Sequence, residues 1–276
     1  MNRSQQPALT LFAIGLIGLG ILALIYGDFA LVWQPVAPWV PGRTALAYAS
    51  GIIMLFGGIG LMLRITAVWS ARILFPYLIL WASLKLPAIF VAPQIEGVWL
   101  GLGELTVLLS GGWILFATVA DIPQDSPLAF AAHENGIRIA RYLFAVSVIP
   151  IGLSHIIYLK ETADLVPAWL PFRAGWAYLT GFGHIASGLG VLFSVFPEVA
   201  AFAEAGMIGV FTLLVWGPKV VTSPKTRLFW TAFFISWVIA AAVWLVAQSI
   251  LKPESAKRDT RKTAGVLKAS QPISRV

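Results

Sequence analysis

The chain has 276 residues, of which 59% are hydrophobic and 11% are charged, and it contains no cysteine. This composition excludes an ordinary soluble domain and indicates an integral membrane protein. The missing cysteine excludes disulfides, thiolate metal ligands and redox cycling by the protein's own thiols. The net charge of +7 comes largely from the C-terminal end of the chain.

Eight apolar runs approach or exceed the roughly 20 residues that a helix needs to cross the hydrocarbon layer. The first is longer than the core of a signal peptide, so we expect it to remain as a span. In chain order the expected spans cover residues 9–26, 45–63, 73–90, 98–119, 139–159, 175–195, 199–216 and 228–250. The sequence therefore predicts an all-α membrane protein with eight transmembrane helices.

The second half of the chain repeats the first. Residues 169–190 match residues 39–60 at an offset of 130, with eight of 22 positions identical. The identical pairs are Trp39/Trp169, Pro41/Pro171, Arg43/Arg173, Ala47/Ala177, Tyr48/Tyr178, Gly51/Gly181, Gly58/Gly188 and Gly60/Gly190. Because each copy holds four spans, both copies enter the membrane from the same side, which predicts two four-helix bundles related by a parallel repeat.

We expect a first four-helix unit in residues 1–120, a polar linker in 121–138 and a second four-helix unit in 139–251. Residues 252–276 form a basic tail that carries seven of the 19 Lys and Arg residues and is too polar to fold alone. Basic residues favour the cytoplasmic side, so both termini are predicted there. The tail contains no aromatic residue to stack on bases, so we expect it to contact lipid and not nucleic acid.

Ionisable side chains inside a bilayer are costly and are the first candidates for function. Lys85 and Glu104 lie at similar depths of about 7 and 9 Å below the outer ends of two consecutive spans, which predicts an ion pair. The pair has two interpretations, a structural contact or a proton or ligand site.

His155 lies about one turn below the outer end of its span, and His184 lies about 14 Å inside the next one. A histidine can relay protons or bind a quinone carbonyl. The alternative is an imidazole hydrogen-bonded to a hydroxyl of a neighbouring helix, for which Ser154, Thr180, Ser187 and Tyr178 are available. Tyr178 completes the candidate polar cavity, and the histidines alone are too few for a metal site.

The order of the motifs resembles the DoxX-like family of bacterial membrane proteins. Each half has a Trp/Pro loop, an Ala-Tyr-x-x-Gly start to a glycine-rich second helix, and a proline near the end of the third helix; the best match is Trp176–Gly181 followed by Gly188 and Gly190. Related second helices often carry a glutamate between the glycine clusters, where this chain has Met54 in one half and His184 in the other.

This resemblance implies a location in the bacterial inner (cytoplasmic) membrane and a role as membrane subunit or accessory of a quinone-linked redox system. A quinone and a redox partner protein are then the implied cofactor and partner. The alternative is a non-enzymatic carrier or scaffold that binds a lipid-like molecule or a partner protein in an outward-facing cavity. Neither the composition nor the spacing decides whether the chain is an enzyme.

Overall fold

The computed structural model describes residues 6–251, and these form helices and no strand. The basic tail that we predicted for residues 252–276 lies outside the described part. The helices are α1 (Gln6–Tyr26), α2 (Arg43–Met62), α3 (Ala67–Val91), α4 (Glu96–Val119), the 3-10 turn η2 (Ala129–Ala131), α5 (His133–Ile157), α6 (Leu159–Leu165), α7 (Arg173–Leu192), α8 (Pro197–Phe211), the π-helical turn η3 (Thr212–Trp216), α9 (Gly217–Thr222) and α10 (Arg227–Ile250).

Seven of the described helical segments are long and apolar enough to cross a membrane, and α8, η3 and α9 count together as one of them. Such a set indicates a multi-pass membrane protein. The remaining predicted span, residues 175–195, forms the 20-residue helix α7, which does not reach the same apolarity. Its hydropathy falls because it carries Thr180, His184 and Ser187, and these polar side chains are bonded to neighbouring helices or to the helix itself.

The helix boundaries differ from the expected ones mainly at the loops. Helix α5 begins at His133, so it takes in part of the polar linker that we predicted for residues 121–138. The short helix α6 lies within the second Trp/Pro loop and was not predicted. Helix α3 continues through Pro87 to Val91, because a proline near a helix end removes only one backbone hydrogen bond.

The helices pack in the same order in both halves. Helix α1 lies on α2, α2 on α3 and α3 on α4, while α5 lies on α7, α7 on α8 and α8 on α10. Helices α4 and α5 join the halves on one side, α10 and α1 on the other, and α4 touches α10 in between.

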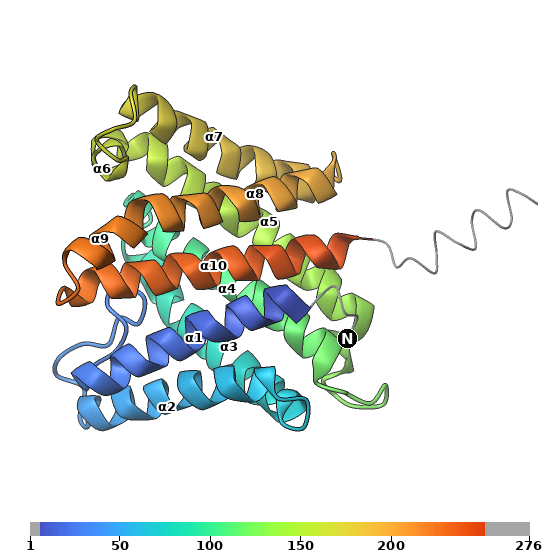
Figure 1. The fold of residues 1–276 in the computed structure, drawn as a ribbon. Coiled ribbons are helices and arrows are strands. Elements are labelled where there is room, and N and C mark those ends of the chain that lie inside the picture. The colour runs from blue at the N-terminus through green and yellow to red at the C-terminus, as the bar shows by residue number, and fades with distance from the viewer. Residues whose placement is uncertain (1–5, 252–276) are drawn as a thin grey trace, which may run out of the picture.

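Both ends of the described chain lie at one end of the bundle, called here the terminal end, together with the α7–α8 turn (Figure 1). The opposite end, called the loop end, holds the 27–42 loop, α6 and α9.

Glycines allow the first two long helices of each half to touch through their backbones. A Cβ atom on Gly20 would lie 2.8 Å from the carbonyl oxygen of Gly51, and a Cβ atom on Gly152 would lie 2.5 Å from that of Gly181. Real Cβ atoms do not approach so closely, so no other residue fits at these crossings without moving a helix. The close approach at Gly20 and Gly51 therefore recurs at Gly152 and Gly181 in α5 and α7.

At the loop end, Asp28 links the loop after α1 to the first residues of α2 and α10. Asp28 accepts hydrogen bonds from Arg43 and, at 2.9 Å, from Arg227, whose second nitrogen donates to the carbonyl of Phe29 at 2.6 Å. Arg227 also lies 4.9 Å from the ring centre of Tyr26. Burial alone would raise the pKa of Asp28, but the hydrogen bonds from both arginines and from the Phe29 N–H outweigh it and hold the pKa below its usual value.

Replacing Gly152 by Ala is expected to destabilise the protein by about 1–3 kcal/mol, because the new methyl group must push α5 away from α7. The matched control is Gly206→Ala on α8, where no atom lies within 4 Å of the added Cβ. The control should be neutral or should raise stability by up to about 1 kcal/mol through helix propensity. Thermal unfolding in detergent measures both changes, and equal midpoints for the two variants would contradict the packing argument.

The Asp28 cluster predicts a loss of stability in acid. Because the folded-state pKa of Asp28 is lowered, its contribution is fully present above the unfolded-state pKa of about 3.9 and is lost as the pH falls through the folded-state value. Asp28→Asn should therefore be less stable than the parent protein at neutral pH, and the difference should shrink at the acid end of that window. A difference that is constant from neutral to strongly acidic pH contradicts this account.

Candidate functional site

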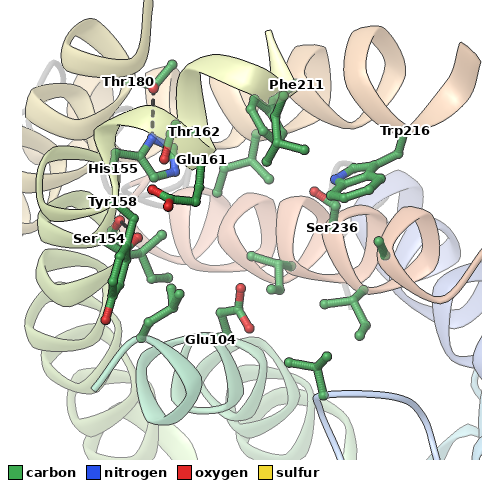
Figure 2. Close-up of a pocket in the computed structure, with 18 of the residues that line it drawn as sticks. Glu104, Ser154, His155, Tyr158, Glu161, Thr162, Thr180, Phe211, Trp216 and Ser236 are labelled. Carbon is green, nitrogen blue, oxygen red and sulfur yellow. Dashed lines mark hydrogen bonds between the residues drawn. The ribbon is translucent and has the colours of Figure 1, made fainter. Parts of the chain in front are cut away.

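A cavity of about 440 Å³ lies in the loop-end half of the bundle, between α4, α5, α7, α8 and α10 (Figure 2). Leu31 and Val32 of the 27–42 loop and residues of α6 also line it. Most of its wall is apolar, with aromatic side chains from Tyr158, Phe211 and Trp216. The polar lining residues are Glu104, Ser154, His155, Tyr158, Glu161, Thr162, Thr180, His184, Thr231 and Ser236.

Three of the five residues proposed from the sequence, Glu104, His155 and His184, line this cavity. Tyr178 does not: its side chain is 40% exposed and stacks on Phe182 with 6.3 Å between the ring centres. Lys85 is also absent from the lining. Of the five proposed residues, Tyr178 and Lys85 therefore lie outside the polar cavity.

The predicted ion pair between Lys85 and Glu104 is wrong, since the described residues include no contact of this pair within 4.0 Å. The ammonium group of Lys85 instead donates at 2.9 Å to the carbonyl oxygen of Val32. Val32 has a φ of 66°, a strained value for a β-branched residue. Lys85 thus fixes the loop at the cavity wall, while Glu104 extends into the cavity (Figure 2) and accepts no hydrogen bond from residues 6–251.

The glycine crossing of α5 and α7 brings the two histidines together. A Cβ on Gly181 would lie 3.0 Å from the Cβ of His155, and one on Gly152 would lie 3.0 Å from that of His184. The two imidazole rings meet edge to face with 4.9 Å between their centres. The sequence does not show that His155 and His184 lie at the same depth, because the crossing brings together turns of α5 and α7 that lie at different distances from their helix ends.

His184 forms a buried acid–base pair that we did not predict. Its Nδ1 lies 2.5 Å from the Oε1 of Glu204 on α8, and both residues are buried. The second carboxyl oxygen of Glu204, Oε2, has no hydrogen-bond partner among the described residues. The signal was present in the sequence, because Glu204 is an acidic residue in the middle of the expected span 199–216.

The hydrogen bonds around His155 assign its tautomer. Its Nδ1 lies 2.8 Å from the hydroxyl oxygen of Thr180, and that hydroxyl also lies 3.0 and 3.1 Å from the carbonyl oxygens of Trp176 and Ala177. A threonine hydroxyl has one hydrogen, and the carbonyls can only accept it. We assign the Nδ1 of neutral His155 as the donor to Thr180, with the Thr180 hydroxyl donating to its own helix, and in this tautomer Nε2 keeps a free lone pair.

The corresponding positions of the first half carry apolar side chains. At the offset of 132 His155 corresponds to Ala23, and at the offset of 130 His184 and Glu204 correspond to Met54 and Leu74. All three first-half residues are buried. The backbone crossing is thus the same in both halves, but only the second half has polar side chains around it.

In the first half, the loop fills the space that the cavity occupies in the second. Thr180 corresponds to Ser50, and the amide nitrogen of Gln34 donates at 2.9 Å to the Ser50 hydroxyl and at 2.8 Å to that of Tyr77. Trp33 beside it is 1% exposed. The indole of Trp33 is therefore buried inside the protein and does not contribute to its surface.

Among residues 6–251, no three His, Cys, Asp or Glu side chains are placed to hold a metal ion. No family model, curated protein or solved structure matches the chain. The chemistry of this site is consequently argued from its own residues.

His184→Ala is expected to destabilise the protein by about 3–5 kcal/mol, because it leaves the carboxyl group of Glu204 buried without a partner. The double variant His184→Met/Glu204→Leu installs the residues found at positions 54 and 74 of the first half. It should recover most of that loss, since replacing a buried pair by apolar residues is often neutral. Thermal unfolding in detergent compares the two, and a double variant less stable than His184→Ala contradicts the pairing.

Proposed function

We propose that this chain is a membrane-embedded subunit or accessory of a quinone-linked redox system, and that the cavity binds the quinone head group. The observation that carries the proposal is a mostly apolar cavity of about 440 Å³ with an imidazole beside it whose Nε2 is free to bond a ligand. Small-molecule sites commonly have this volume and combine apolar walls with a few polar groups that orient the ligand.

The lining suits a flat ring with two oxygens. Phe211 and Trp216 offer aromatic surface to the ring face. The hydroxyls of Thr162 and Ser236 have no hydrogen-bond partner in the described chain and can donate to a quinone carbonyl, while the Nε2 of His155 accepts from a quinol hydroxyl. These groups would distinguish the two redox states of the ring. The chain has no cysteine thiol to carry electrons, so we assign that role to the proposed partner of the redox system.

The proposed arrangement in the membrane has eight spans, with α7 as the sixth, in two DoxX-like four-helix units related by a parallel repeat. It is supported by the matching order of helix contacts and by the paired glycine crossings. We place the terminal end in the bacterial cytoplasm, because the sequence assigns twelve Lys and Arg residues to that side and seven to the other. The twelve are Arg3, Arg64, Arg72, Arg138, Arg141 and the seven of residues 252–276. The cavity then opens in the outer half of the inner membrane.

A second candidate, a carrier or scaffold for a lipid-like molecule, is favoured by the charge of the lining. The cavity is lined by the carboxyl groups of Glu104 and Glu161, and no Lys or Arg appears among its described lining residues. An apolar cavity with acidic groups prefers a cationic amphiphile to an anionic one.

The test is equilibrium binding of a water-soluble short-chain ubiquinone to the purified protein. His155→Leu should weaken binding by roughly tenfold, the loss expected when one good hydrogen bond is removed. Tyr178→Phe is the matched control, because Tyr178 belongs to the same helix pair but lies outside the cavity, and it should bind as the parent does.

Extraction and mass spectrometry of molecules that co-purify in mild detergent complete the test. A quinone that is present in the parent protein and absent from His155→Leu supports the proposal. Ubiquinone binding that is indifferent to His155, or displaced by a cationic amphiphile such as dodecyltrimethylammonium, overturns it in favour of the carrier.

A further inference from the structure

A second cavity, of about 560 Å³, lies between α7 and α8 on the other side of the His184–Glu204 pair. It extends to the α7–α8 turn, where Phe193, Val195 and Phe196 line it. This turn is at the terminal end of the bundle, whereas the first cavity is lined by the 27–42 loop and α6 at the loop end. The two cavities therefore reach toward opposite ends of the molecule.

The His184–Glu204 hydrogen bond joins the lining of one cavity to that of the other. His184 lines the first cavity and Glu204 the second, and Met207 lines both. The Nδ1 of His184 and the Oε1 of Glu204 are 2.5 Å apart. The remaining oxygen of Glu204 has no partner among the described residues, although the side chain is fully buried. A buried carboxyl oxygen without a partner is costly unless it exchanges a proton or meets water.

We propose that the His184–Glu204 pair is a proton-exchange site that connects the two cavities, so that protons move between the ligand cavity and the terminal end of the bundle. This inference rests on the proposed function only for the identity of the ligand in the first cavity. The proton path itself depends on the pair and on the two cavities.

The transfer requires no electrons and balances in protons. The Nε2 of His184 takes one proton from the first cavity, and the Nδ1 proton passes to the Oε1 of Glu204. A neutral imidazole, now protonated at Nε2, and a neutral carboxylic acid result. The acid then releases its proton toward the second cavity and returns to the carboxylate. One proton has entered on the loop side and one has left on the terminal side. The imidazole is left with its proton on Nε2, so a half-turn of the ring or a tautomer exchange must restore an N–H toward Glu204 before the next proton is taken.

The charged groups around the pair permit this exchange. From α5, His155 faces His184, and its Nδ1 is occupied by Thr180. Glu104 of α4 and Glu161 of α6 line the same cavity as His184, and α10 contributes the hydroxyls of Thr231 and Ser236. No Lys or Arg is among the described lining residues of either cavity. Among the neighbouring charged groups, only a protonated His155 opposes an added proton on His184, and the carboxylates of Glu104 and Glu161 favour it.

The first test asks whether the cavities open on opposite sides. Because the chain has no cysteine, Ser236→Cys and Ala203→Cys each place a single thiol, one in the lining of each cavity. In oriented proteoliposomes, a membrane-impermeant maleimide should label each variant from one side only, and the two sides should differ. If both thiols react from the same side, or if Ala203→Cys reacts only with a lipid-soluble maleimide, the second cavity is a lipid groove and the proposal is overturned.

The second test measures proton flux into the same vesicles, driven by a valinomycin potassium potential and reported by an internal pH dye. The parent protein, in the presence of the short-chain ubiquinone, should conduct protons, and Glu204→Gln should reduce the flux by at least roughly tenfold, as for loss of a positioned acid–base group. The double variant His184→Met/Glu204→Leu, designed to remain folded, should show the same loss. Tyr178→Phe should conduct as the parent does.

Ubiquinone binding in the same preparations separates the two proposals. Flux that depends on Glu204 in a protein that does not bind ubiquinone supports the proton path and rejects the quinone. Binding that persists while parent and Glu204→Gln show equal flux rejects the proton path and leaves the quinone proposal standing.

Discussion

Two helix backbones can touch only where neither helix carries a Cβ atom at the crossing, and this constraint determines the geometry of both halves of the protein. The crossing of Gly20 with Gly51 joins α1 to α2, and that of Gly152 with Gly181 joins α5 to α7. In a bilayer such contacts replace the hydrophobic drive that is missing between apolar helices in lipid. In the second half the same crossing places His155 and His184 ring to ring, so the packing of the scaffold and the chemistry of the site have one origin.

The sequence predicts those features that depend on local pattern. Apolar runs located the long helices. Contacts between side chains of different helices are harder to predict from the sequence, because they depend on the rotation of each helix about its axis as well as on the depth of the residue. Lys85 and Glu104 lie at similar depths, yet Lys85 bonds to the loop at Val32. Glu204 was overlooked even though its charge in an apolar run is a recognisable signal, and it proved to be the partner of His184.

The two halves of the chain do not form equivalent sites. Around the first crossing, Ala23, Met54 and Leu74 close the space with apolar side chains, and the loop inserts Trp33 and Gln34. The amide of Gln34 satisfies the hydroxyls of Ser50 and Tyr77 from within the protein. The corresponding hydroxyl of the second half, Thr180, bonds instead to His155 and faces a cavity. One half is thus a completed core, and the other leaves its polar groups available to a ligand.

The π-helical turn η3 accommodates one residue more than the matching stretch of α3. Matching positions differ by 130 residues at Gly60/Gly190 and by 131 at Pro87/Pro218. Residues 212–216 form a wider turn between them, and the helix continues into α9 with its proline in the matching place. Such π-helical turns are frequent at functional sites. Here the wider turn lies between Phe211 and Trp216 in the cavity wall, so the extra residue changes the binding surface and leaves the glycine contacts that hold the helices together untouched.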